Sequence, residues 1–380
     1  MPRTLTIKKV DGKPGQVYYP LQLNEVPRPV PGPKEVLVRL HAAALNHRDL
    51  FIRQQLYPGI SFEQPLLADG VGTVVEAGAD VDPAVARSLL RARVLLTPSR
   101  GWAADPRGPE DPNPASFSVV GGSALLPPGS GTAQDYALLD PAELEPAPPH
   151  LTAAEAAALP LVGLTAWRAL VTKGLGAPDA DAAAAAADGI NVLVTGIGGG
   201  VALSALQFAV ALGARVFVTS GDPAKLERAR RELGAAGGVS YRDAAWDKQL
   251  AAQLPASRPY LDLVIDGAGG DVVSRAVRLL RPGGVISVYG MTVAPKMDWT
   301  MQAVLRNVDL RGSTMGSRAE FRAMVDFVRR HTIHPIVSRV VRGLDDIAAI
   351  DGLFEDIRAG RQFGKLVIEI SPEGEDSAKL

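Results

Sequence analysis

Two kinds of segment alternate along this chain: short apolar runs, and longer stretches whose apolar residues have helical spacing. The β-branched run at residues 190–195 predicts a buried parallel strand, and the apolar stretch at residues 201–212 predicts a helix. Strand and helix patterns then alternate at 215–219, 223–233, 238–241, 261–265, 271–280 and 285–289. This alternation predicts an α/β domain with a doubly wound parallel sheet and right-handed crossovers.

The flanking parts of the chain show a mixed pattern. Strands are expected at 5–10, 35–41, 70–76, 133–139 and 365–370, and helices at 151–159, from 163, and at 318–330. Residues 97–131 are rich in proline, glycine and serine, which is typical of a binding loop, a lid or a disordered segment. The alanine-rich stretch 179–188 is interpreted as a surface insertion without chemistry.

The turn between the strand at 190–195 and its helix is rich in glycine. Glycines let the backbone turn tightly, and the free N–H groups at the start of the helix can hold a pyrophosphate. Ala202 replaces the third glycine of the usual fingerprint, which the fingerprint permits. A tight turn without a ligand is the simpler alternative. The residues predicted to cradle a dinucleotide are Gly196, Gly198, Gly199, Gly200 and Val201.

Composition narrows the classes of protein. A chain of 380 residues, 47% hydrophobic and 21% charged, is long enough for two domains. Forty basic and forty-one acidic residues leave a net charge of -1, so neither nucleic acid nor a membrane is an expected partner. The chain has no cysteine, which excludes disulfides, thiolate catalysis and zinc sites built on sulfur.

The two ends of the chain bear on localisation. The amino-terminal sequence MPRTLTIKKV lacks the apolar core of a signal peptide. Ala378, Lys379 and Leu380 form a close variant of the Ser-Lys-Leu peroxisomal address. The expected location is therefore cytoplasmic or peroxisomal.

Several motifs together resemble one family. In order along the chain they are AALNHRDL, YPG, DGVGTVVEAG, AALPLVGLTAW, VTGIGGGVALSALQFA, VFVTSGDPAKLERAR, RPGGVISVYG and FGKLVIEI. They cover nearly the whole chain and resemble the medium-chain dehydrogenase/reductase superfamily, in its zinc-free quinone oxidoreductase and enoyl reductase branches. The resemblance implies a nicotinamide-dependent enzyme with a small-molecule substrate.

The resemblance also implies an architecture. A catalytic domain with a GroES-like partial β-barrel is expected at residues 1–158 and 297–380, with a Rossmann cofactor-binding domain at 159–296 between its two parts. The active site is expected in the cleft between the domains, and the enzyme is expected to be a homodimer.

The resemblance implies that no zinc is bound. Zinc-dependent relatives carry a cysteine where Asn46 stands and a glycine-histidine-glutamate triplet where residues 67–69 stand. His41, His47 and Asp69 could be proposed as another metal cluster, but they lack recognisable ligand spacing. Hydrogen bonding within the scaffold is the favoured interpretation of these residues.

The cofactor prediction depends on the end of the strand at 215–219. An acid there would bind the ribose hydroxyls of NADH and repel the 2′-phosphate of NADPH, but the position falls near Ser220. Lys225 resembles the family lysine that pairs with this phosphate, and Tyr241 is placed alongside it. Asp222 could cap the next helix or contact the ribose instead. NADPH is therefore predicted, with NADH less favoured.

Further cofactor residues are predicted from the topology. Ligands of doubly wound sheets bind at the carboxyl ends of the strands, which places Asp266, Gly267 and Tyr289 beside the cofactor. The resemblance adds Thr165, in the motif AALPLVGLTAW.

The reaction is predicted from what the chain lacks. Without a Lewis acid, reduction favours a conjugated acceptor, whose negative charge spreads into an enolate or hydroquinone anion. Tyr57 matches the proton donor of related enoyl thioester reductases, and Asn46 could donate its amide to the oxyanion. Tyr57 could equally be a turn residue beside Pro58. Arg48 and Arg53 are further candidates to bind substrate charge.

The leading prediction is thus a zinc-independent, NADPH-dependent reductase of an activated double bond or a quinone. An acyl thioester gains weight as the substrate if the peroxisomal address operates. The alternative among enzymes is a zinc-free alcohol dehydrogenase or carbonyl reductase. A non-catalytic NADPH-binding redox sensor is the alternative from another class.

Overall fold

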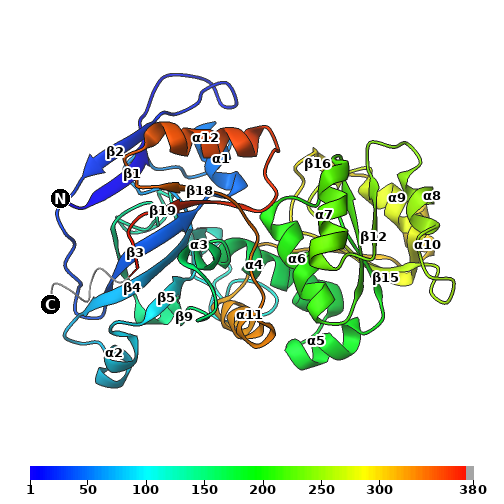
Figure 1. Cartoon of the computed structure of the whole chain (residues 1–380), viewed down its shortest axis with the longest axis horizontal. Helices are drawn as coiled ribbons and strands as arrows, with labels where there is room; N and C mark the ends of the chain where they lie inside the picture. Colours follow the sequence, from blue (N-terminus) through cyan, green and yellow to red (C-terminus); the bar gives the residue numbers. More distant parts are fainter. Residues whose placement is uncertain (374–380) are drawn as a thin grey trace. The chain divides into compact units, whose positions relative to one another are not determined.

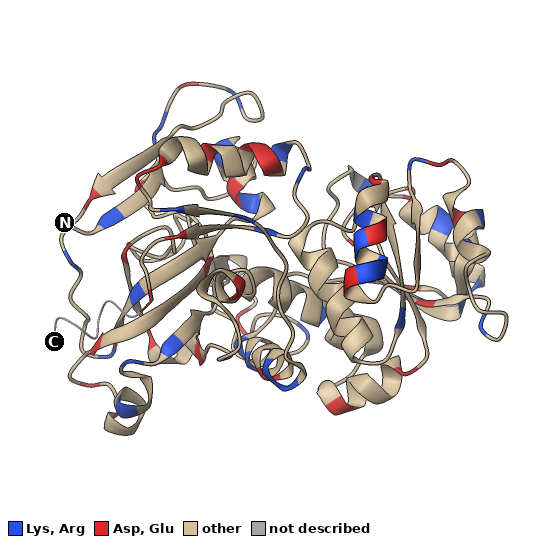
Figure 2. Cartoon of the chain, viewed as in Figure 1, with Lys and Arg blue, Asp and Glu red and all other residues tan. Residues whose placement is uncertain are grey.

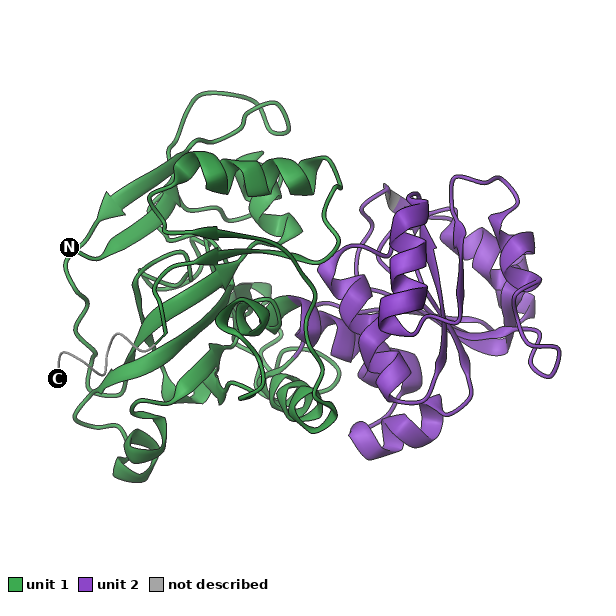
Figure 3. Cartoon of the chain, in the orientation of Figure 1, with its two compact units in different colours: residues 1–161, 317–380 green, residues 162–316 purple. Residues whose placement is uncertain are grey.

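A computed structural model of the chain describes residues 1–373, except for the side chains of residues 294 and 295. It divides into two compact units, unit 1 (Met1–Leu161 and Ser317–Leu380) and unit 2 (Val162–Gly316), coloured separately in Figure 3. The second boundary lies at Gly316 and not at the expected residue 296, because β17 (Asp309–Gly312) still pairs with a strand of unit 2. The predicted peroxisomal tripeptide lies outside the described residues.

Unit 2 is built on a six-stranded parallel sheet. Its strand order is β12-β11-β10-β13-β15-β17, so the order reverses between β10 and β13 (Figure 1). This arrangement confirms the predicted doubly wound fold, and the reversal point is where such sheets bind ligands. The strands before β17 are β10 (Asn191–Val194), β11 (Arg215–Ser220), β12 (Gly237–Ser240), β13 (Leu261–Asp266) and β15 (Leu280–Val288).

Helices flank this sheet, and those predicted at 201–212, 223–233 and 271–280 are present within one residue of the predicted bounds. The alanine-rich stretch is itself helical, with Asp179 accepting a hydrogen bond from the N–H of Ala182 at 2.8 Å. Charged residues of both signs lie along α7 (Figure 2). The helices are α4 (Pro160–Trp167), the π-helix η3 (Arg168–Leu175), α5 (Ala180–Ala187), α6 (Gly200–Ala211), α7 (Pro223–Leu233), α8 (Trp246–Ala251), α9 (Val272–Leu279) and α10 (Met301–Leu305). A short ladder joins β14 (Gly269–Gly270) to β16 (Ala294–Met297).

Unit 1 contains the predicted GroES-like partial barrel. Its seven-stranded sheet has the order β18-β19-β3-β4-β5-β9, with β8 also paired to β3. The pairs are antiparallel except β18 with β19. The strands are β3 (Val36–Ala44), β4 (Asp69–Ala77), β5 (Arg93–Leu96), β8 (Tyr136–Leu139), β9 (Leu144–Pro146), β18 (Val337–Arg342) and β19 (Lys365–Glu369), and a hairpin of β1 (Arg3–Ile7) and β2 (Leu21–Glu25) stands apart.

The residues that follow β5 are largely irregular, as expected. Within them the carboxylate of Glu110 accepts hydrogen bonds from the N–H groups of Ala103, Ala104 and Asp105, which closes a local loop. The remaining elements of unit 1 are α1 (His47–Arg53), α2 (Pro83–Leu89), β6 (Ser99–Arg100), η1 (Pro114–Ser116), β7 (Ser118–Val119), η2 (Pro141–Glu143), α3 (Ala153–Ala157), α11 (Arg318–His331) and α12 (Ile347–Arg358). Across the described residues, no helix is both long and apolar enough to cross a bilayer.

Candidate active site

The glycine turn of unit 2 follows β10 and leads into α6. Gly196 has a φ of 67° and Gly198 a φ of 135°, conformations in which an L side chain would be strained. Gly199, the N-cap of α6, has an ordinary φ of -79°, and a Cβ added there would meet no atom within 4 Å. Neither its backbone nor its packing requires glycine, so the open space in front of it fits a ligand that approaches the backbone.

This turn has the features of an anion site. α6 begins at Gly200, and its N-cap has no side chain to accept a hydrogen bond from the first N–H groups. Val201 follows in the first turn and is half-buried. Free N–H groups and the positive end of the helix dipole can therefore hold a diphosphate here. The residues present fit the nicotinamide dinucleotide that the fold implies.

Asp266, at the end of β13, is held by hydrogen bonds beside the turn. Its Oδ1 accepts the hydroxyl of Thr195 at 2.5 Å, and its Oδ2 accepts the N–H of Gly269 at 2.9 Å. Burial nevertheless raises the pKa of this carboxyl. A Cβ on Gly267 would stand 2.4 Å from the ring of Tyr289, so glycine is needed for that ring to lie against the backbone. Burial of this ring raises the pKa of the Tyr289 hydroxyl.

The acid that follows β11 is Asp222, and the structure shows what its carboxylate binds. Asp222 caps α7, with Oδ1 accepting the N–H of Ala224 at 2.9 Å, so its carboxylate is engaged by the helix. Lys225 lies in the first turn of α7, and burial lowers the pKa of its ammonium. A Cβ on Gly221 would meet Tyr241 Oη at 2.6 Å and Arg242 Nε at 2.8 Å. Both side chains therefore lie against Gly221, immediately after Ser220.

The structure thus gathers most of the predicted cofactor residues at the carboxyl ends of β10, β11, β13 and β15 or in the turns that follow β11 and β12. Thr165 lies instead on α4, where its buried hydroxyl is 3.8 Å from the sulfur of Met315.

In unit 1, Asn46 belongs to a buried cluster of charged and polar groups. The ammonium of Lys365 donates to Asn46 Oδ1 at 2.6 Å, to Asp69 Oδ2 at 2.7 Å and to the carbonyl of Leu45 at 2.7 Å. Asn46 Nδ2 donates to Asp69 Oδ2 at 2.9 Å. The second oxygen of Asp69 accepts the N–H of Leu161 at 2.7 Å. These contacts join α1, β4 and β19 at one point.

This cluster bears directly on whether a metal fits. Zinc requires nitrogen, oxygen or sulfur ligands around a free cation position. Here a cation of the chain itself, Lys365, already contacts the amide of Asn46 and the carboxylate of Asp69. In the described part of the chain, no three His, Cys, Asp or Glu residues are grouped to hold a metal ion. The donor set at Asn46 and Asp69 is that of a buried ion pair and does not fit zinc.

Sequence reasoning did not find Lys365. The signal was present in the motif FGKLVIEI, where Lys365 opens a strand whose next three residues are apolar and buried. A lysine at such a position is almost always paired, although the sequence alone does not name the partner.

Tyr57 is held by Arg48. The Arg48 guanidinium lies 4.7 Å from the centre of the Tyr57 ring, within cation–π range. The same guanidinium donates to the carbonyls of Val120 at 2.8 Å and Gly121 at 3.0 Å. Arg48 therefore fixes the irregular loop against α1 and supports Tyr57.

The other candidates from the sequence have structural partners. Arg53 is buried, donates to the carbonyl of Tyr19 and pairs with Asp351 at 2.6 Å, so its charge is used within the scaffold. His41 contacts Thr73 Oγ1 at 2.8 Å and Ser371 Oγ at 3.2 Å, as the favoured interpretation expected. His47 lies at the start of α1 with its ring against Phe51, and partial burial of the ring lowers its pKa.

Asp49 predicts a pH dependence of the protein's stability. Its Oδ2 accepts the N–H of Asn46 at 2.7 Å, and burial raises the pKa of this carboxyl from 3.8 to about 6, against the opposing effect of Arg48. The native protein therefore holds the proton more tightly than the unfolded chain does. The free energy of unfolding should fall as pH rises from about 4 to about 6. Asp49→Asn should remove this contribution, at most about 3 kcal/mol, when urea unfolding is compared across that range. An unchanged slope in the variant would contradict the assignment.

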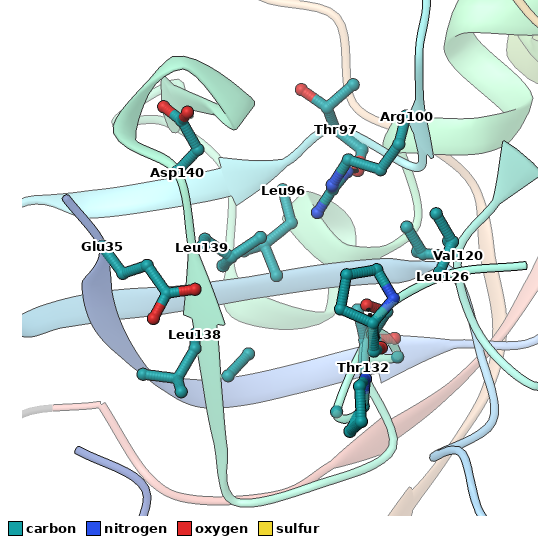
Figure 4. Close-up of a pocket in the computed structure, with 16 residues that line it drawn as sticks. Glu35, Leu96, Thr97, Arg100, Val120, Leu126, Thr132, Leu138, Leu139 and Asp140 are labelled. Carbon is teal, nitrogen blue, oxygen red and sulfur yellow. Dashed lines mark hydrogen bonds between the residues drawn. The ribbon is translucent and has the colours of Figure 1, made fainter. Parts of the chain in front are cut away.

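A cavity of about 340 Å³ lies elsewhere in unit 1 (Figure 4). Its lining includes Arg100, whose guanidinium donates to the carbonyls of Thr97 and Ser99. Thr132, also in the lining, donates its hydroxyl to the carbonyl of Asp69 at 2.7 Å. Asn46, Tyr57 and Lys365 are not among the lining residues, so this cavity is separate from the site predicted around them.

Comparison with known proteins identifies the family. The alcohol dehydrogenase GroES-like domain matches residues 32–149, and the zinc-binding dehydrogenase family matches residues 200–330. The chain belongs to the medium-chain dehydrogenase/reductase superfamily and is an oxidoreductase of the class that uses nicotinamide cofactors. This confirms the resemblance at the level of the superfamily, while the zinc-free branch stays a prediction.

Among individual relatives, the chain is 58% identical over 374 residues to the zinc-type alcohol dehydrogenase-like protein YogA of Leptosphaeria maculans, covering 97% of this chain and 100% of that one. A zinc-type alcohol dehydrogenase-like protein of Schizosaccharomyces pombe is 32% identical over 335 residues, covering 86% and 87%. A solved NAD-dependent alcohol dehydrogenase superposes with a TM-score of 0.79 at 30% identity, covering 97% of this chain and 100% of that one.

Proposed function

We propose that the protein is a zinc-independent, NADPH-dependent oxidoreductase that reduces an activated double bond or a quinone. The observation that carries the proposal is the contact of Lys365 with Asn46 and Asp69, at the positions where zinc-dependent relatives bind their metal. A zinc ion would contribute several kcal/mol of charge stabilisation to an isolated carbonyl. A conjugated acceptor needs less, because its charge spreads over several atoms.

The residues of each unit have separate tasks in this proposal. The turn at Gly196–Gly200 and the residues around Ser220 and Lys225 bind the dinucleotide, and bound NADPH supplies the hydride. Asn46 donates an amide hydrogen to the oxygen on which charge develops. Tyr57, held by Arg48, donates the proton that completes the reduction.

The experiment is NADPH oxidation assayed with quinones, enones, enoyl thioesters and unconjugated aldehydes, with the metal content of the same sample measured. We expect turnover with at least one conjugated class and less than stoichiometric zinc. Turnover restricted to aldehydes would establish the carbonyl reductase, which the names of the alcohol dehydrogenase relatives favour. Tight NADPH binding without turnover would establish the redox sensor. Stoichiometric zinc in active protein would overturn the metal assignment.

Lys225→Ala should weaken NADPH binding by about 10-fold to 100-fold and leave NADH binding nearly unchanged. The reason is that a charge-assisted hydrogen bond to the 2′-phosphate is worth about 1.5–3 kcal/mol, and NADH has no such phosphate. Dissociation constants by fluorescence titration measure the effect. Arg231→Ala, on the exposed last turn of the same helix, is the control and should change neither affinity. Equal losses for both dinucleotides at Lys225 would remove the basis of the NADPH assignment.

A homodimer is also proposed, through the edge of the sheet in unit 2. β17 is the last strand of that sheet, and Leu310 on it is 43% exposed. The preceding helix α10 exposes Met301, Val304 and Leu305 as well. Exposed apolar residues beside an open strand edge favour pairing with a second copy. Leu310→Lys should shift a dimer to a monomer in sedimentation. A wild-type monomer at micromolar concentration would contradict the proposal.

A further inference from the structure

The amide of Asn46 has two ends, and only one of them suits the proposed role. Its Nδ2 can donate to an oxyanion, whereas its Oδ1 would repel one. An unconstrained asparagine can rotate and present either end. What fixes the amide therefore decides whether Asn46 can stabilise developing negative charge.

Lys365 fixes the oxygen end. An ammonium has hydrogens to donate and no lone pair to accept, so the atom of Asn46 that lies 2.6 Å from Nζ must be the carbonyl oxygen. The same ammonium donates to the carbonyl of Leu45 and to Asp69, which uses all three of its hydrogens. Lys365 consequently has no hydrogen left for a substrate and acts through Asn46.

Asp69 fixes the nitrogen end. An ionised carboxylate only accepts, and Asp69 Oδ2 lies 2.9 Å from Asn46 Nδ2. The carboxylate is fully buried and is itself held by the N–H of Leu161. Rotation of the amide would place its N–H group against the ammonium and its oxygen against the carboxylate. Both new contacts would be repulsive.

We propose that Lys365 and Asp69 are positioning residues, which hold the Asn46 amide so that one hydrogen of Nδ2 binds Asp69 and the other is presented to the substrate oxygen. This inference rests on the proposed function, because it names how that site obtains its hydrogen-bond donor. A buried ion pair thereby takes over the orienting part of a metal ion's task. All three residues are buried, with exposed fractions of 7% for Asn46, 4% for Lys365 and 0% for Asp69.

The test combines Lys365→Met with Asp69→Asn. The double variant removes both charges at similar side-chain volume, which avoids leaving one buried charge without its partner. Residue 69 can then both donate and accept, so either orientation of the Asn46 amide becomes possible. On the best substrate of the panel, we expect kcat to fall about 10-fold to 100-fold, towards the value for Asn46→Ala, with the KM for NADPH unchanged. A folded double variant with kcat within twofold of wild type would overturn the proposal.

A control variant separates positioning from general loss of stability. Arg258 and Asp262 form another ion pair with a buried carboxylate, at 2.7 Å, in unit 2. Arg258→Met combined with Asp262→Asn should lower the melting temperature and leave kcat unchanged. A matching fall in kcat in this control would mean that the loss at Lys365 and Asp69 reports stability alone, and would overturn the inference.

A second measurement is independent of turnover. In protein labelled with ¹⁵N-asparagine, the side-chain NH₂ signals of Asn46 are assigned by their loss in Asn46→Ala. We expect two widely separated proton shifts in the wild type. In the double variant, the two shifts should approach each other, or a second pair of signals should appear for the second orientation of the amide. Unchanged signals would overturn the positioning role whatever the substrate panel shows. Changed signals in a protein that reduces no conjugated acceptor would uphold the positioning role and reject the proposed reaction.

Discussion

Gly199→Val is expected to abolish useful NADPH binding in a protein that remains folded. The φ of Gly199, -79°, is accessible to valine, and a Cβ there meets nothing within 4 Å. The new side chain would occupy the space in which the diphosphate approaches the backbone. Losing two charge-assisted hydrogen bonds from N–H groups corresponds to a loss of affinity of about 100-fold or more. Calorimetric titration with NADPH, beside a thermal melt, measures both parts of the expectation.

Gly108→Val is the matched control for this variant. Gly108 lies in the irregular part of unit 1, and a Cβ added there also meets nothing within 4 Å. It should leave both NADPH affinity and melting temperature unchanged. If Gly199→Val bound NADPH as the wild type does, the turn would be a tight connection without a ligand, and the cofactor would have to bind elsewhere.

Tyr57→Phe is expected to lower kcat by about 10²-fold to 10⁴-fold, the usual contribution of a general acid. The change removes one oxygen and keeps the ring, which can still stack on the guanidinium of Arg48. Cofactor affinity should therefore not change. Single-turnover rates with the preferred acceptor measure the effect without interference from product release. A variant with kcat within threefold of wild type would show that Tyr57 is a turn residue.

Tyr18 provides the control for the loss of a hydroxyl. Its ring lies 4.0 Å from the guanidinium of Arg53, an arrangement similar to Tyr57 on Arg48. Its buried hydroxyl finds no hydrogen-bond partner within the described residues. Tyr18→Phe should leave kcat unchanged and should not destabilise the protein, because an unsatisfied buried oxygen is removed.

The fold could be predicted well where hydrophobic periodicity was strong. The helix α7 at Pro223–Leu233 has the predicted bounds, because a cap, a proline at its start and a glycine at its end mark it locally. The extra strand β17 was missed and moved the unit boundary, because Asp309–Gly312 is short and exposed. Only its pairing with β15 makes it a strand, and pairing between distant segments leaves no local pattern.

The candidate site divides in the same way. The glycine turn and the capping role open to Asp222 are local features, so the sequence shows them. Lys365 reaches Asn46 across more than 300 positions of sequence, and no spacing rule connects them. The sequence predicted Asn46 as an amide donor and Asp69 as a residue hydrogen-bonded within the scaffold, but it did not indicate Lys365, which contacts both. The support that Arg48 gives to Tyr57 was also invisible, because it depends on a loop without regular structure.

Two parts of that loop should differ in how much sequence change they tolerate. Arg48 binds the carbonyls of Val120 and Gly121, and a Cβ on Gly121 would collide with the backbone of Leu67 at 2.2 Å. Mutations at Val120 and Gly121 would therefore disturb Tyr57 and be removed by selection. Among the described residues, the stretch closed by Glu110 is tied to α11, through the carbonyls of Trp102 and Ala103, and not to α1, so substitutions at its exposed positions should leave Arg48 in place. Changes in that stretch would then alter the surface of unit 1 while the contact between Arg48 and Tyr57 is kept.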